Sequence, residues 1–100
     1  MTDQPEFSFV LPCLNEEQTL EACVKKCRHS AEVNGFTAEI LVADNGSTDN
    51  SIAIAKRLGC RVVNVAKKGY GSALISGIKN ANGSFAVSYT HLTLPTIYSV

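Results

Sequence analysis

Two short stretches of this 100-residue sequence carry residue types that could bind a polar ligand. In the first, the apolar run Ile40-Leu41-Val42-Ala43 ends in Asp44, and the turn Asn45-Gly46-Ser47-Thr48-Asp49 follows. In the second, Ala66-Lys67-Lys68-Gly69-Tyr70-Gly71-Ser72-Ala73 opens into an apolar helical pattern. A carboxylate at the C-terminal end of a buried strand lies where open α/β sheets bind ligands. Glycines, lysines and the N–H groups of a helix N-terminus suit an anion such as a diphosphate.

Each stretch also has a purely structural interpretation. Turns of the Asp-Asn-Gly-Ser type are common because Asn, Asp and Gly tolerate turn conformations, whether or not a ligand is present. The Gly-rich stretch could be a flexible connection. It is neither a Walker A loop, which needs Gly-Lys-Ser/Thr, nor the Gly-x-Gly-x-x-Gly dinucleotide fingerprint, which should follow the first strand. On these residues alone, both interpretations stay open.

The first elements that must position these loops are a strand and an amphipathic helix. Phe7–Leu11 is predicted to be a strand that Pro12 stops, since proline cannot donate to a sheet ladder. Asn15 is a good N-cap for the helix, and Asn34-Gly35 is its expected end. The helix is predicted from apolar residues at i, i+3, i+4 and i+7, which are Leu20, Cys23, Val24 and Cys27.

The same alternation continues along the chain. A strand is predicted over Ala38–Ala43, a helix over Asp49–Leu58 with Gly59 after it, and a strand over Arg61–Val65. A third helix should run through Leu74–Ala81 after the Gly-rich loop. Strands and helices in this order are typical of right-handed βαβ units in a parallel sheet. We therefore predict an α/β fold with a Rossmann-like parallel sheet of three to four strands and flanking helices.

Composition excludes several classes of partner and compartment. Nine basic and nine acidic residues cancel, so we expect no binding of nucleic acid or of an anionic membrane through bulk charge. No apolar run reaches the roughly 20 residues that span a bilayer, so the sequence predicts no membrane segment. The polar start Met1–Glu6 does not resemble a signal peptide, and we expect a cytoplasmic protein.

The four cysteines have no zinc-binding spacing. Cys23 and Cys27 form an i, i+4 pair without a second pair nearby, so we expect Cys13, Cys23, Cys27 and Cys60 to be reduced thiols that fill the core. His29 is interpreted as a solvated residue near the end of its helix. One hundred residues make at most one small domain.

Three ordered motifs together resemble a known family. Val10–Glu17 matches a strand-Pro-x-x-Asn-Glu opening. Val42–Asp49 matches an acidic turn of the form Asp-Asp/Asn-Gly-Ser-Thr-Asp. Lys68–Ala73, together with Ala81-Asn82-Gly83, matches a Gly-x-Gly-x-Ala helix that ends in Ala-x-Gly. In this combination, over about 85 of the 100 residues, the chain resembles the nucleotide-binding half of the family 2 glycosyltransferases, which have the GT-A fold. The likeness is greatest to relatives of dolichyl-phosphate and undecaprenyl-phosphate sugar transferases.

The resemblance implies a nucleotide-sugar site. It implies that Asp44 contacts the base or ribose and that Pro12, Leu14 and Glu16 line the same pocket. It also implies that the loop with Lys68, Gly69 and Gly71 passes near the nucleotide or diphosphate. Asn45 stands where many relatives have a second Asp, which leaves the ligand type open.

The chain departs from the family pattern after Gly83. In the family, the next strand ends in an Asp-x-Asp motif that binds a divalent metal, Mg or Mn, which neutralises the leaving diphosphate. Here no Asp or Glu occurs after Asp49, so the metal expected for the intact enzyme has no such ligands in this chain. A fourth strand could run from Phe85 to about Tyr89. We expect residues 1–85 to be a truncated nucleotide-binding domain and residues 86–100 to be a non-native tail.

Three functions are consistent with these observations. The first is an inactive N-terminal fragment of a glycosyltransferase that moves a sugar from a UDP- or GDP-sugar to a lipid-phosphate or glycan acceptor. The second is a small, non-catalytic module that binds a nucleotide or another anion. The third is a structural α/β domain in which Asp44 and Asp49 only cap a turn and a helix.

Overall fold

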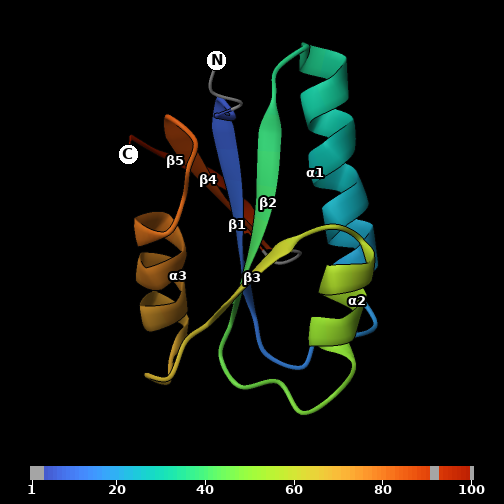
Figure 1. The fold of residues 1–100 in the computed structure, drawn as a ribbon, viewed down its shortest axis with the longest axis vertical. Coiled ribbons are helices and arrows are strands. Elements are labelled where there is room, and N and C mark those ends of the chain that lie inside the picture. The colour runs from blue at the N-terminus through green and yellow to red at the C-terminus, as the bar shows by residue number, and fades with distance from the viewer. Residues whose placement is uncertain (1–3, 91–92, 100) are drawn as a thin grey trace.

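A computed structural model describes residues 4–90 and 93–99, which form one sheet between two layers of helices (Figure 1). The sheet has the strand order β3-β2-β1-β4-β5. The first four strands are parallel, and β5 runs antiparallel to β4. This architecture confirms the predicted α/β fold. The strands are β1 (Phe7–Cys13), β2 (Ala38–Asp44), β3 (Arg61–Asn64), β4 (Phe85–Thr90) and β5 (Thr93–Ser99), and the helices are α1 (Leu20–Asn34), α2 (Ser51–Arg57) and α3 (Tyr70–Lys79).

The two faces of the sheet are covered by different helices. Alternate residues of β1 point to opposite faces: Phe9 and Leu11 pack in the cluster with α1 and α2, whereas Val10 packs with α3. Helix α3 lies so close to β1 that a Cβ atom on Gly77 would overlap the side chain of Val10. Both faces of the central strands are therefore buried, as their continuous apolar sequences predict.

Several predicted boundaries are wrong, and local contacts explain why. Helix α1 begins at Leu20 after the cap residue Thr19, because Asn15 instead adopts a left-handed conformation (φ 53°) in the preceding loop. Helix α3 begins at Tyr70, inside the stretch predicted to be a loop. Pro12 does not end β1: the strand pairs with β2 alone at this position, an edge-like setting in which proline is tolerated.

The remaining differences concern shorter or additional elements. Helix α2 is restricted to Ser51–Arg57, and the sequence predicts no element that corresponds to β5. The end of α1 at Asn34-Gly35 is confirmed, whereas α2 ends at Arg57, two residues before Gly59. Both glycines have positive φ angles, which favour glycine. All four cysteines are free and buried, as expected.

A partly buried hydrogen-bond network joins four segments at the end of the sheet opposite the loops of interest. The Ser8 hydroxyl donates to Glu39 Oε2 at 2.5 Å and accepts the Gly83 N–H at 2.9 Å. Glu39 also accepts the Asn82 N–H at 2.6 Å and pairs with Arg61 at 2.6 Å. A Cβ atom on Gly83 would lie 2.6 Å from the backbone carbon of Phe7. Gly83 is thus required for the close approach of the chain to β1.

Candidate nucleotide-sugar site

Three loops lie at the C-terminal ends of β1, β2 and β3, at the lower end of the sheet in Figure 1. The strand order reverses between β1 and β4, because β2 and β3 lie on one side of β1 and β4 on the other. Ligands of open α/β sheets bind at such a reversal, beyond the carboxyl ends of the strands. The topology thus brings the sequence-predicted site residues to one edge of the sheet.

Asn15 connects the β1 loop to the β2 loop. Its side-chain oxygen accepts the N–H groups of Thr48 at 2.8 Å and Asp49 at 3.3 Å, while its own N–H donates to the Ser47 hydroxyl at 2.9 Å. Further bonds between the loops run from the Glu16 N–H to the Ser51 hydroxyl (2.8 Å), from the Glu17 N–H to Asp49 Oδ2 (3.1 Å) and from the Asn50 N–H to Glu17 Oε1 (3.1 Å). These two loops form one hydrogen-bonded unit.

The Asp44 carboxylate organises its own turn. The residue is only 1% exposed. Its Oδ2 accepts the N–H groups of Gly46 at 3.1 Å and Ser47 at 2.9 Å, and its Oδ1 accepts the Ser47 hydroxyl at 2.6 Å. These contacts agree with the structural role that the sequence also allowed. The contact of Asp44 with a base or ribose stays a prediction.

Asn45 connects the β2 loop to the β3 loop, a role that the sequence did not reveal. Its side-chain nitrogen donates to the carbonyl oxygens of Val65 at 3.1 Å and Lys67 at 2.9 Å. Its side-chain oxygen accepts the Gly69 N–H at 2.8 Å. An Asp at this position could accept the last bond but could donate neither of the first two. Asn45 is therefore suited to position the basic loop, whether or not a ligand is present.

The basic loop lies against the Asp44 turn. The Lys68 ammonium is 3.5 Å from the carbonyl oxygen of Asn45 and would be 3.0 Å from a Cβ atom on Gly46. Gly69 has a φ of 118° and directly precedes α3. Cβ atoms on Gly69 or Gly71 would meet nothing within 4 Å, so the backbone is approachable here. A helix N-terminus with a nearby lysine can attract an anion.

The remaining predicted residues come from the β1 strand and its loop. Pro12 is half-buried in β1, and Leu14 is 50% exposed in the loop. The Glu16 carboxylate accepts the Thr19 hydroxyl at 2.8 Å, and its carbonyl accepts the N–H groups of Thr19 and Leu20. Glu16 therefore forms the turn that begins α1. Tyr70 lies between Gly69 and Gly71 and is 54% exposed. It was not among the predicted site residues.

The ionisable groups around the loops favour neither metal binding nor thiolate chemistry. Burial raises the pKa of the Cys13 thiol, although hydrogen bonds with Ser51 and Ser47 oppose this. At Asp49, partial burial would raise the pKa, but hydrogen bonds from the Ser51 side chain and backbone and from the Glu17 backbone hold it below its ordinary value. Among the described residues, no group of three or more His, Cys, Asp or Glu side chains could hold a metal ion. The donors in this part of the chain thus do not fit a divalent metal.

Comparisons with known proteins agree with this geometry. Residues 8–89 match the model of the glycosyl transferase family 2. An uncharacterized glycosyltransferase of Mycobacterium tuberculosis is 45% identical over 69 residues, which are 69% of this chain and 28% of that protein. The dolichyl-phosphate beta-glucosyltransferase of Drosophila melanogaster is 32% identical over a region that covers 83% of this chain and 30% of that protein.

A solved structure shows the same fold. Glucosyl-3-phosphoglycerate synthase from M. tuberculosis, in complex with Mn²⁺, uridine diphosphate and glucosyl-3-phosphoglycerate, superimposes with a TM-score of 0.72 at 30% identity. The match covers 85% of this chain and 33% of that one. The present chain thus spans about a third or less of the length of these relatives. It has their GT-A fold, and it belongs to glycosyl transferase family 2.

Proposed function

We propose that this chain is the nucleotide-sugar-binding part of a glycosyltransferase that uses a UDP- or GDP-linked donor. The observation that carries the proposal is the joining of three strand-end loops by Asn15 and Asn45, next to Lys68 and the start of α3. Ligands of open α/β sheets bind at such loops, beyond the carboxyl ends of the strands. The UDP and UDP-glucose bound by the M. tuberculosis synthase support a UDP-linked donor.

We propose that the donor lies across the three loops. The base or ribose would lie at the turn that Asp44 organises, with Pro12, Leu14 and Glu16 beside it. The diphosphate would lie near Lys68, Gly69 and Gly71, where a cation, an open backbone and the positive end of the α3 dipole coincide. Lys68 already lies against the Asp44 turn, so one ligand of this size could reach both.

The proposed acceptor is a lipid phosphate or a glycan. The fly relative is named for a dolichyl-phosphate acceptor, and a relative from Haloferax volcanii, 33% identical over 81 residues, is named a hexosyltransferase of low-salt glycan biosynthesis. Phosphoglycerate, which the M. tuberculosis synthase binds, is a third acceptor chemistry. No described helix is both long and apolar enough to cross a bilayer. We propose a cytoplasmic location for this chain.

We further propose that this chain binds its donor without transferring the sugar. The proposal rests on the lack of any Asp or Glu after Asp49 and on the poor fit of the described donors to a metal. The same observation favours the second candidate, a non-catalytic module for nucleotides or other anions. Sequencing of the source DNA beyond the codon for Phe85 distinguishes the two candidates. A reading frame that continues with paired aspartates would support a glycosyltransferase parent. A reading frame that repeats the present residues 86–100 and then stops would support the module.

Calorimetric titration with UDP, GDP and UDP-glucose tests the binding site. We expect saturable binding that weakens about tenfold in Lys68→Ala, since charge-assisted hydrogen bonds to phosphate are strong. Lys79→Ala, at the other end of α3, removes the same charge and should leave binding unchanged. Absence of binding by the folded wild-type chain, or equal loss in both variants, would overturn the proposed site.

A further inference from the structure

We propose that a cavity between α1 and the N-terminal half of β2 is a second site, which binds a small aromatic carboxylate. The cavity has a volume of about 460 Å³, within the range of small-molecule sites. Its lining includes Ala38, Glu39 and Ile40 of β2, whereas the candidate nucleotide site begins at Asp44, at the other end of the strand. At roughly 3.3 Å per residue, Ile40 and Asp44 are about 13 Å apart along β2.

The cavity exists because neighbouring elements differ in length. Helix α1 has 15 residues and spans about 22 Å, while α2 has 7 residues and spans about 10 Å. Strand β3 pairs only with Leu41–Asp44 of β2. In Figure 1 the upper part of α1 stands beside β2 without α2 next to it. The hollow is thus a consequence of the fold rather than of one side chain.

Both apolar and charged side chains line the cavity, which is partly open to solvent. Phe9, Cys27 and Ile40 are each buried, with exposures of 6% or less, and Phe36 lies beside them. Burial raises the pKa of the Cys27 thiol to about 12, so this sulfur carries no charge at neutral pH. A flat hydrocarbon ring could lie against these apolar side chains, with the charged side chains of the lining beside it.

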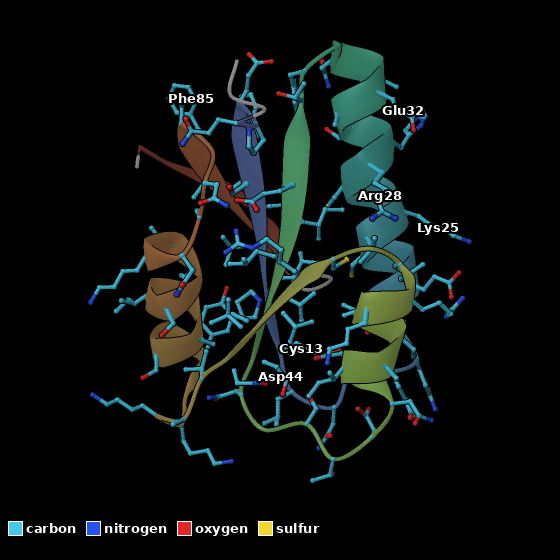
Figure 2. All side chains as sticks on the ribbon, in the orientation of Figure 1. Cys13, Lys25, Arg28, Glu32, Asp44 and Phe85 are labelled. Atoms are coloured by element: carbon cyan, nitrogen blue, oxygen red, sulfur yellow. The ribbon has the colours of Figure 1, made fainter. Side chains whose placement is uncertain are left out.

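Arg28 makes the rim suitable for an anion. Its guanidinium extends from α1 to the carbonyl oxygen of Leu58, a neutral acceptor, and the described residues give it no ion pair (Figure 2). Glu39 does not neutralise the charge of Arg28, because both carboxylate oxygens of Glu39 already bind Arg61, Ser8 and Asn82. Glu32, one helical turn after Arg28, forms no ion pair with it. A carboxylate on the ring would give the Arg28 guanidinium a charged partner in addition to the Leu58 carbonyl.

A chemical-shift titration of backbone amides with naphthoate tests this site on the whole chain. We expect saturable shifts at Ala31, Ala38 and Ile40, with none at Gly46 or Gly69. The uncharged alcohol analogue of naphthoate should bind about fivefold more weakly or worse, because it cannot form the charge-assisted bond. Equal affinity of acid and alcohol, or shifts only at the nucleotide loops, would overturn the proposal.

Three charge variants distinguish binding in the cavity from nonspecific electrostatic binding of naphthoate. Arg28→Gln should weaken naphthoate binding, and Glu32→Gln should strengthen it by removing a repelling carboxylate. Lys25→Gln, on the same helix but outside the cavity, should leave it unchanged. In a fourth variant, Ala31→Leu, the larger side chain should fill the cavity and abolish binding. If Lys25→Gln and Arg28→Gln have the same effect while both variants keep the wild-type spectrum, the anion is held by net charge and the proposal is wrong.

Discussion

The side-chain amide of Asn45 donates a hydrogen bond of 3.1 Å to the carbonyl oxygen of Val65, twenty residues further along the chain. Together with its bonds to Lys67 and Gly69, this contact holds the basic loop against the Asp44 turn. One buried amide therefore fixes the relative position of two loops that the proposed ligand must contact together.

Replacement of Asn45 by Asp tests this role. Asn45→Asp keeps the shape of the side chain but turns two donors into acceptors that face carbonyl oxygens, so we expect a loss of about 2–3 kcal/mol in the free energy of unfolding. Denaturant unfolding followed by circular dichroism measures this loss. Asn64→Asp, an exposed position on β3, adds the same charge and should change stability by less than about 0.5 kcal/mol. Equal effects of the two variants would show that the Asn45 bonds add nothing.

Two glycines in the same motif should respond in opposite ways to alanine. A Cβ atom on Gly83 would lie 2.6 Å from a backbone atom of β1, so Gly83→Ala should cost about 3 kcal/mol or prevent folding. Gly71 lies in the first turn of α3 with open space around it, so Gly71→Ala should stabilise by up to about 1 kcal/mol. Thermal unfolding of both variants checks the pair. A stable, wild-type-like Gly83→Ala would contradict the close approach of the α3–β4 connection to β1.

The elements could be predicted from the sequence more completely than the loop contacts. Apolar runs and helical periodicity are local patterns, and they identified β1 to β4 and the cores of all three helices. Asn15 illustrates where this information ends. Asn is favoured both as an N-cap and in the left-handed conformation, and its bonds to Thr48 and Asp49, more than thirty residues away, select the second.

The candidate site shows the same division. Parallel strands with loops at their C-terminal ends imply that Asp44, Glu16 and Lys68 gather at one edge, and the structure brings them there. The particular bonds depend on which donor meets which acceptor across separate loops. Asn45 was therefore seen only as a substitute for Asp, and its two donated bonds were not foreseen.

Glu39 should make stability depend on pH in the acid range. Its burial would raise the pKa, but hydrogen bonds from Ser8 and Asn82 and the pair with Arg61 hold it below the ordinary value of 4.5. A carboxyl whose folded-state pKa is lowered stabilises the fold fully above the unfolded value, and this contribution is lost as pH falls through the folded pKa. We therefore expect wild-type stability to decline below about pH 4.5.

Glu39→Gln identifies this contribution. The variant should be about 1–2 kcal/mol less stable at pH 7, since it loses charge-assisted hydrogen bonds in a partly buried network. Its stability should also change less between pH 6 and pH 3 than that of the wild type, by urea unfolding at each pH. Glu32→Gln, at an exposed position of α1, is the matched control and should leave the pH profile unaltered. Parallel profiles of wild type and Glu39→Gln would exclude the network as the source.

Strand β5 (Thr93–Ser99) has a structural role that deletion can test. β5 pairs with β4 from Phe85↔Ser99 to Thr90↔Thr93, so it covers the β4 edge that faces away from β1. A chain that ends at Thr90 would expose that edge, and unpaired parallel-sheet edges favour association between molecules. We expect the shortened chain to melt at a lower temperature and to form oligomers as its concentration rises, measured by light scattering. If it remains monomeric and melts like the full chain, β5 contributes nothing to the sheet, as expected of a non-native tail.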